Sequence, residues 1–313
     1  MPLKRRPDGV RVWDIEPYTK IMPYIMKRRS DAQNMFLAEI ICDPIDDFIK
    51  KERDKGNRIT YLHVVMAGLV RLYSQREKMN RFIMNGKIYQ RNSIQLSFVV
   101  KKALRDDAFD TTITLDFDGT ENIYEVAKKI DDAIRENTSN ASNDVDKTAN
   151  MLTKAGPGMI KFVVGLIKFL DKINCLPKSI LKVSPFHASC FVTNMKSIKT
   201  DYIYHHIYDF GTIGMFVGLG KEAEKPIVKN GEITIGKIMN LGIVMDERFC
   251  DGLYYANSFR KFSEVLADPS VLLEKYDRKP IVPMTKQEEK EYNKEGRKKR
   301  RQVIQQYLKK AAK

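Results

Sequence analysis

The chain has 313 residues, of which 43% are apolar and 10% aromatic; this provides material for a large core and excludes general disorder. The formal net charge of +15 predicts an anionic partner, such as nucleic acid, a lipid surface or a phosphorylated small molecule. Residues 286–313 hold 11 Lys and Arg against 4 Glu and so supply +7 of that charge, which leaves an ordinary balance for the rest.

The N-terminal stretch "MPLKRRPDGVRVW" has no apolar core behind its charges, so it is not a secretory signal. The most apolar stretch, "MIKFVVGLIKFL" at 159–170, is too short to span a bilayer and contains two lysines. The four cysteines are far apart and lie beside apolar residues, which is typical of reduced, mostly buried thiols. We therefore expect a cytoplasmic protein without a transmembrane segment.

The first half of the chain alternates helix and strand patterns. The predicted elements are a short helix at 17–34, a strand at 35–43, a helix at 44–56 that ends at Gly56, and a long buried helix at 60–77. Two apolar runs then flank Asn85-Gly86, which strongly indicates a hairpin. Residues 93–102 and 110–117 are rich in β-forming side chains and precede an amphipathic helix at 122–138.

The polar stretch 139–150 predicts a loop or a frayed helix end. Residues 158–174 form a predicted helix that is apolar nearly all round; we expect it to be buried, lining a channel or a subunit contact, with membrane-surface binding as the alternative. Strand patterns follow at 189–195, 211–221 and 225–246, and a helix at 253–267 closes the globular part. This irregular alternation predicts one α/β domain, a mixed sheet with packed helices.

The stretch "DFDGT" at 116–120 imitates the first motif of haloacid-dehalogenase-type phosphatases. That motif normally lies near the chain start on a buried parallel strand, which is not its place here. We interpret Asp118-Gly119-Thr120 as a turn and helix cap.

The stretch "VMDERFCDGLYYANSF" at 244–259 is more specific. A D-G pair between a strand and a helix can be a structural turn, with Asp251 as the cap of the helix. However, D-E-R-x-x-D-G followed by F-x-x-x-L-x-D-P resembles the catalytic core of the 2-oxo acid dehydrogenase acyltransferases, which have D-H-R-x-x-D-G. "SCFVTNMKS" resembles their F-T-I-S-N-L-G strand, with Lys196 in place of the glycine. The resemblance covers about residues 15–275 and implies the chloramphenicol-acetyltransferase-like fold.

The resemblance implies chemistry at named positions. The family uses a histidine base to deprotonate a thiol, a hydroxyl that donates to the oxyanion, and a buried Asp–Arg pair that holds the turn. The hydroxyl carries over to Thr193, the turn aspartate to Asp251, and the signature arginine to Arg248. The arginine partner of Asp251 is Arg28 or Arg29. The base position is Glu247.

An exposed glutamate, with a pKa of about 4.3, is a poor base toward a thiol of about 8.5. Three hypotheses stay open. Glu247 is a base retuned by burial in a dry channel, or His205 or His206 replaces it, or the site has lost this chemistry and serves binding or assembly.

The resemblance also implies a homotrimer, with active sites at subunit interfaces and a channel for coenzyme A as thiol substrate. The multienzyme relatives carry a lipoyl domain ahead of the catalytic one; here the catalytic-like region starts within about 15 residues of Met1, so no covalently bound lipoyl group is expected, and no metal. We expect a basic segment at 1–14, the catalytic domain at 15–275 and a basic tail at 276–313. The tail is predicted as a solvated helix, with nucleic-acid or membrane-surface contact as a weaker alternative.

Overall fold

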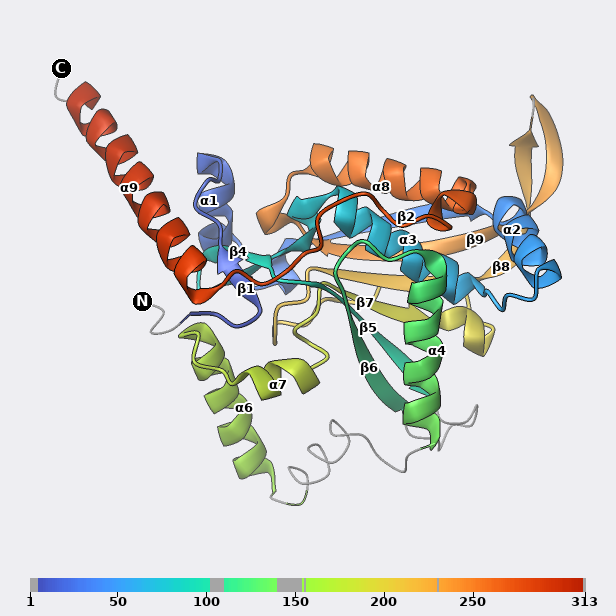
Figure 1. Cartoon of the computed structure of the whole chain (residues 1–313), viewed down its shortest axis with the longest axis horizontal. Coiled ribbons are helices and arrows are strands. Elements are labelled where there is room, and N and C mark those ends of the chain that lie inside the picture. Colours follow the sequence, from blue (N-terminus) through green and yellow to red (C-terminus); the bar gives the residue numbers. More distant parts are fainter. Residues whose placement is uncertain (1–4, 102–109, 140–153, 155, 230, 312–313) are drawn as a thin grey trace.

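The computed structural model describes residues 5–101, 110–139, 154, 156–229 and 231–311 (Figure 1). The helices are α1 (Pro17–Ile25), α2 (Asp43–Asp54), α3 (Tyr61–Gln75), α4 (Ile123–Ser139), α6 (Pro157–Lys172), α7 (Lys178–Val183), α8 (Gly252–Ala267) and α9 (Lys286–Ala311). The strands are β1 (Gly9–Arg11), β2 (Gln33–Ile41), β3 (Arg81–Met84), β4 (Lys87–Arg91), β5 (Ile94–Lys101), β6 (Asp110–Phe117), β7 (Cys190–Asn194), β8 (Met215–Lys229) and β9 (Glu232–Asp246). Short 3-10 turns are η1 (Ser30–Ala32), η2 (Glu77–Asn80), η3 (Met195–Ile198), η4 (Glu247–Phe249) and η5 (Pro269–Leu272).

A mixed sheet of six strands, in the order β2-β9-β8-β7-β5-β6, forms the centre of the molecule. The pairs β5–β7 and β7–β8 are parallel, and the other pairs are antiparallel. A smaller sheet, β1-β4-β3, lies beside it. The prediction of a mixed α/β sheet is confirmed.

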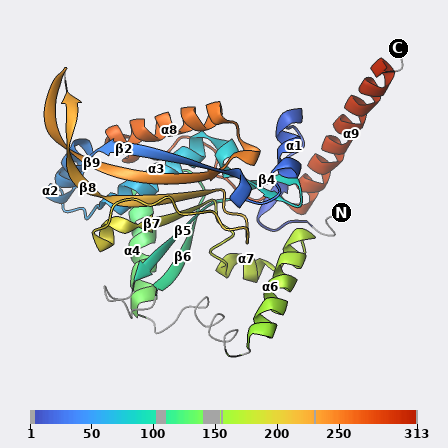
Figure 2. The ribbon, with the colours of Figure 1, turned by 180° about the vertical axis from the view of Figure 1, so that it is seen from behind.

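Helices α3, α4 and α8 form a layer on one face of the large sheet (Figures 1 and 2). Most residues of α3 are buried, and these are mainly apolar, with His63, Arg71 and Ser74 as the exceptions. Gly68 lets the Phe262 ring of α8 approach closely, since an added Cβ would lie 3.0 Å from it. The main core fills the space between these helices and the sheet. No helix among the described residues is long and apolar enough to cross a membrane.

Local sequence signals account for several element ends. Thr60 caps α3 by accepting a hydrogen bond from the backbone N–H of His63. Asn122 and Glu125 each accept from the other's backbone N–H, which is a capping box at the start of α4. The predicted hairpin is confirmed: Asn85 and Gly86 join β3 to β4 with φ of 51° and 68°.

Between η3 and β8, an extended segment crosses the other face of the sheet. The Ile203 carbonyl approaches β8 and β9 so closely that a Cβ added at Gly218 or Gly242 would lie 2.6 or 2.3 Å from it. Further along, the Ile207 N–H donates to the Gln33 side chain of β2. The segment therefore runs from the middle of β9 toward the end of that strand.

Two predictions differ from the structure. The first helix ends at Ile25, because Arg248 donates to the carbonyls of Met26 and Lys27, which a longer helix would use itself. The helix predicted at 158–174 forms as α6, but its burial is wrong: Phe162 and Phe169 face solvent. The predicted loop at 139–150 lies almost wholly outside the described residues.

The D-F-D-G-T stretch lies at the end of β6, the outermost strand of the large sheet, which pairs antiparallel with β5. Asp118 accepts from the N–H and hydroxyl of Thr120, and Gly119 has a φ of +89°. The turn interpretation therefore describes this stretch, and Asn122, not Asp118, caps the helix. The four cysteines are free thiols, and only Cys175 is not fully buried.

Candidate active site

The turn that follows β9 is organised by a buried ion pair between Asp246 and Arg248. Arg248 donates from Nε to Oδ1 at 2.8 Å and from Nη2 to Oδ2 at 2.5 Å. Its backbone N–H also donates to Oδ1, so Asp246 caps η4. Two parallel charge-assisted bonds of this kind fix the arginine geometrically as well as electrostatically.

A second arginine lies against the same carboxylate. Arg29 Nε is 4.0 Å from Asp246 Oδ2, and the Arg29 guanidinium donates to the backbone carbonyls of Tyr208 and Asp209. Burial, only partly offset by the charge of Asp246, lowers the pKa of Arg29 to about 10. The cluster of Asp246, Arg248 and Arg29 thus joins the end of β9 to η1 and to the segment before β8.

The arginine pairing expected for Asp251 is located elsewhere. Asp251 is exposed and caps α8 by accepting from the backbone N–H of Tyr254 at 2.8 Å. Arg28 is also exposed and pairs with Asp31. The carboxylate that contacts arginine is Asp246, five residues earlier, and the arginine that lies against it from the N-terminal part of the chain is Arg29, the residue before η1. The motif D-E-R-x-x-D-G contains two aspartates, and the sequence alone does not indicate which of them contacts an arginine.

Glu247 projects from this turn and is partly exposed. Its Oε2 accepts from the side-chain amide of Asn34 at 2.6 Å. Asn34 lies on β2, where it pairs with Met245 of β9. A strand neighbour therefore orients the carboxylate at the base position, and no local signal around Glu247 predicts this contact.

Thr193 lies on β7, two strands away from β9 in the large sheet. It pairs with Gly218 of β8, which in turn pairs with Gly242 of β9, four residues before Asp246. At about 3.3 Å per strand residue, Glu247 is therefore at least roughly 13 Å further along the sheet. The Thr193 hydroxyl makes only a weak contact, to Met195 Sδ at 3.8 Å. The structure does not bring these two side chains together within one protomer.

The histidine pair lies on the segment that crosses the sheet. The His205 ring stacks on Phe216 of β8 with centroids 4.0 Å apart, and burial lowers the pKa of His205. His206 is exposed. Because Phe216 pairs with Val244 of β9, His205 lies at a level of the sheet between those of Thr193 and Glu247.

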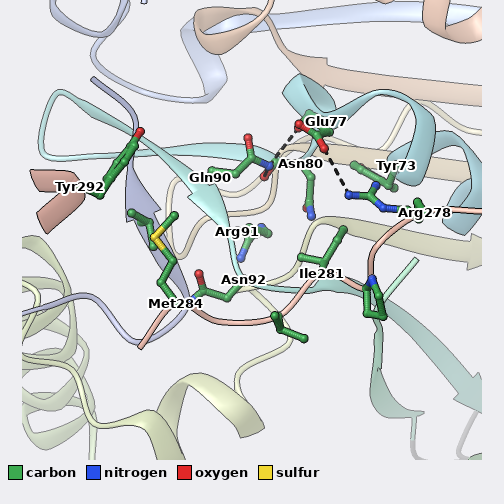
Figure 3. A pocket seen from close by; sticks show the side chains of 13 residues that line it. Tyr73, Glu77, Asn80, Gln90, Arg91, Asn92, Arg278, Ile281, Met284 and Tyr292 are labelled. Carbon is green, nitrogen blue, oxygen red and sulfur yellow. Dashed lines mark hydrogen bonds and ion pairs between the residues drawn. The ribbon is translucent and has the colours of Figure 1, made fainter. Parts of the chain in front are cut away.

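Two cavities lie away from these residues. One, of about 310 Å³, lies under the segment 278–284 and is lined by Tyr73, Asn80 and the buried Arg91 (Figure 3). An Arg278–Glu77 ion pair of 3.2 Å closes one side. The other, of about 480 Å³, lies beside the D-F-D-G-T turn. Neither Thr193 nor Glu247 lines them. Among the described residues, no group of His, Cys, Asp and Glu is arranged to hold a metal ion.

The fold is that of the chloramphenicol-acetyltransferase-like acyltransferase cores. A truncated catalytic core of the 2-oxoacid dehydrogenase complex from Thermoplasma acidophilum superposes with a TM-score of 0.52 at 12% identity, over 82% of this chain and 98% of that one. A probable dihydrolipoamide acetyltransferase from Listeria monocytogenes gives 0.51 at 10% identity, over 85% and 97%.

The family resemblance is confirmed for the C-terminal part. Residues 188–274 match the family of 2-oxoacid dehydrogenases acyltransferase (catalytic domain). The acetyltransferase component of the pyruvate dehydrogenase complex from Bacillus subtilis is 30% identical over 86 residues, which is 28% of this chain and 19% of that protein. Its counterpart from Staphylococcus aureus strain Mu50 is 37% identical over 57 residues, 18% and 13%. The matches thus span a fifth or less of these curated relatives.

Proposed function

We propose that this protein is an acyltransferase that uses coenzyme A as its thiol substrate, with Glu247 as the base. The observation that carries the proposal is the turn after β9. There, the buried Asp246–Arg248 pair fixes the backbone on either side of Glu247, whose side chain reaches the surface and accepts from Asn34. A carboxylate that is held in place can accept the proton of a thiol bound against it, although this transfer is uphill because a thiol is the weaker acid.

In the proposed step, Glu247 takes the proton of the thiol, and the thiolate attacks the carbonyl carbon of the acyl donor. The Thr193 hydroxyl donates a hydrogen bond to the oxyanion that forms. Collapse of the intermediate re-forms the carbonyl and expels the donor's leaving group, which takes up the proton from Glu247. Arg248 and Asp246 act by holding the turn.

The separation of Glu247 and Thr193 within one protomer supports a site shared between two chains. We propose a homotrimer in which Glu247 of one protomer and Thr193 of the next face one channel. Closed cyclic symmetry makes every such interface equivalent and gives three sites. In this proposal residues 15–275 form the catalytic unit, and residues 1–14 and 276–313 are additions to it.

A second candidate is a relative that binds acyl ligands or partners without turnover. The Asn34 contact favours it, since an amide donor stabilises the ionised carboxylate. The partly buried ring of His205, with its lowered pKa, offers a neutral imidazole between the levels of Thr193 and Glu247, so replacement of the base by histidine is the remaining variant of the catalytic proposal.

An acyl-transfer assay distinguishes the candidates. Release or consumption of free coenzyme A thiol is followed across pH with a panel of acyl donors, for the wild type, Glu247→Gln and His205→Gln. The proposal predicts a loss of at least about 100-fold in kcat for Glu247→Gln only. Loss in His205→Gln alone identifies the histidine as the base. If Glu247→His gains activity that the wild type lacks, the chain is a non-catalytic relative.

A further inference from the structure

Helix α6 presents an apolar stripe to solvent. Met159, Phe162, Leu166 and Phe169 are 49%, 65%, 43% and 58% exposed. At 100° per residue these four side chains fall within an arc of about 80° on the helix surface. Four large apolar side chains in one stripe form a contiguous patch rather than scattered surface residues.

Basic side chains run along one edge of this stripe. Lys161, Lys168 and Lys172 fall within an arc of about 40°, whose centre is about 120° from that of the stripe. The single acidic residue of α6, Asp171, is buried. The exposed charges of α6 are therefore all positive and lie on one flank of the apolar stripe.

The helix is fastened to the body so that the stripe stays outward. Arg6 Nη1 lies 2.8 Å from Asp171 Oδ1, and His187 Nε2 lies 3.2 Å from Asp171 Oδ2. All three side chains are buried. Because this network holds the face opposite the stripe, α6 cannot turn its phenylalanines inward without breaking buried ion pairs.

The surroundings add positive charge. Figures 1 and 2 show α6 and the basic helix α9 at the same end of the molecule, and the tip of the β8–β9 hairpin at the other. Residues 297–301 of α9 read R-K-K-R-R and are exposed. This end of the molecule therefore carries exposed positive charge on both helices.

We propose that the α6 stripe (Met159, Phe162, Leu166 and Phe169) docks this protein on an anionic phospholipid surface. The phenylalanines enter the boundary between headgroups and acyl chains, and the three lysines remain among the headgroup phosphates. The positive charge favours a lipid surface over a protein groove. An apolar groove would contact only the stripe, whereas an anionic bilayer would also attract the three lysines and the basic residues of α9.

Co-sedimentation of the full-length protein with vesicles tests the proposal. Vesicles of phosphatidylcholine are compared with vesicles that contain 30% phosphatidylglycerol, a proportion of about one lipid in three chosen to give a strongly negative surface. The wild type is expected to bind the anionic vesicles only. The double variant Phe162→Glu/Phe169→Glu is expected to lose at least about tenfold in vesicle partitioning.

A control variant tests whether vesicle binding depends on the α6 stripe itself or on any exposed apolar pair. Val228 and Ile233, on the β8–β9 hairpin, are 73% and 81% exposed. The variant Val228→Glu/Ile233→Glu is expected to bind anionic vesicles like the wild type. In Phe162→Trp, the emission of the new tryptophan is expected to shift to shorter wavelength when anionic vesicles are added.

Three outcomes overturn the proposal: a wild type that stays in the supernatant with anionic vesicles, equal partitioning of the two double variants, or no emission shift for Phe162→Trp. Light scattering without lipid measures the molar mass of the assembly and tests whether a second copy of the chain packs on the stripe. If Phe162→Glu/Phe169→Glu alone lowers the molar mass of the assembly, a second copy of the chain covers the stripe and the lipid proposal is wrong.

Discussion

Asp246 is the residue whose loss the structure predicts to be most damaging to the turn. The change Asp246→Asn removes the carboxylate that receives three hydrogen bonds from Arg248 and faces Arg29 at 4.0 Å. Both arginines are buried, so two cations remain close together without the carboxylate that lies against both of them. Breaking a buried ion pair from one side costs about 3–5 kcal/mol. For a chain of this size that corresponds to a decrease in Tm of about 5–8 °C.

Urea denaturation followed by far-ultraviolet circular dichroism measures this cost, with Asp251→Asn as the matched control. Asp251 only caps α8 from an exposed position, and asparagine caps as well as aspartate, so its change should stay within about 0.5 kcal/mol. A cost for Asp251→Asn equal to that for Asp246→Asn, or a cost below about 1 kcal/mol for Asp246→Asn, refutes the assignment of the arginine cluster to Asp246.

Three further predictions concern other contacts. Asn34→Ala is expected to lower the kcat of acyl transfer about tenfold with KM unchanged, because it frees the Glu247 carboxylate; steady-state kinetics checks this, and an unchanged kcat contradicts it. Gly242→Ala should cost roughly 2–4 kcal/mol in denaturant titration, because its Cβ meets a backbone carbonyl, whereas Gly252→Ala has open space and should be near neutral; equal effects contradict the close approach. Burial tends to raise the pKa of Asp171, but its bonds to the neighbouring imidazole and guanidinium hold that pKa below the ordinary value. Its carboxylate therefore stabilises the fold above about pH 4 and loses this effect as the pH falls through the lowered pKa. Asp171→Asn should flatten the acid limb of stability against pH; an unchanged slope contradicts it.

Local chemistry explains the parts of the fold that the sequence predicts well. Asn85 and Gly86 adopt the positive φ that a two-residue hairpin needs, and Gly56 has φ of +85° just after α2. These signals act within a few residues, so the turns they form can be predicted without knowledge of tertiary contacts. The order of the last two strands and the turn after β9 could likewise be predicted from a short motif, D-E-R-x-x-D-G.

The remaining features depend on contacts between distant segments. Asn34 meets Glu247, and Arg29 meets Asp246, only because β2 and η1 lie beside the end of β9 in the folded chain. The prediction that α6 is buried was wrong for a different reason. An apolar helix indicates that some partner covers it, but the pattern of Phe162 and its neighbours does not say whether that partner belongs to the same chain.

Mixed oligomers test the central claim, a site in which Glu247 of one protomer serves with Thr193 of the next. Co-expressed Glu247→Gln and Thr193→Ala chains, differently tagged and purified together, are assayed for acyl transfer beside each variant alone. Each variant alone is expected to be inactive. Random trimers should recover about a quarter of the wild-type activity, since one site in four then receives both native side chains. A mixture no more active than its two components contradicts a site shared between protomers.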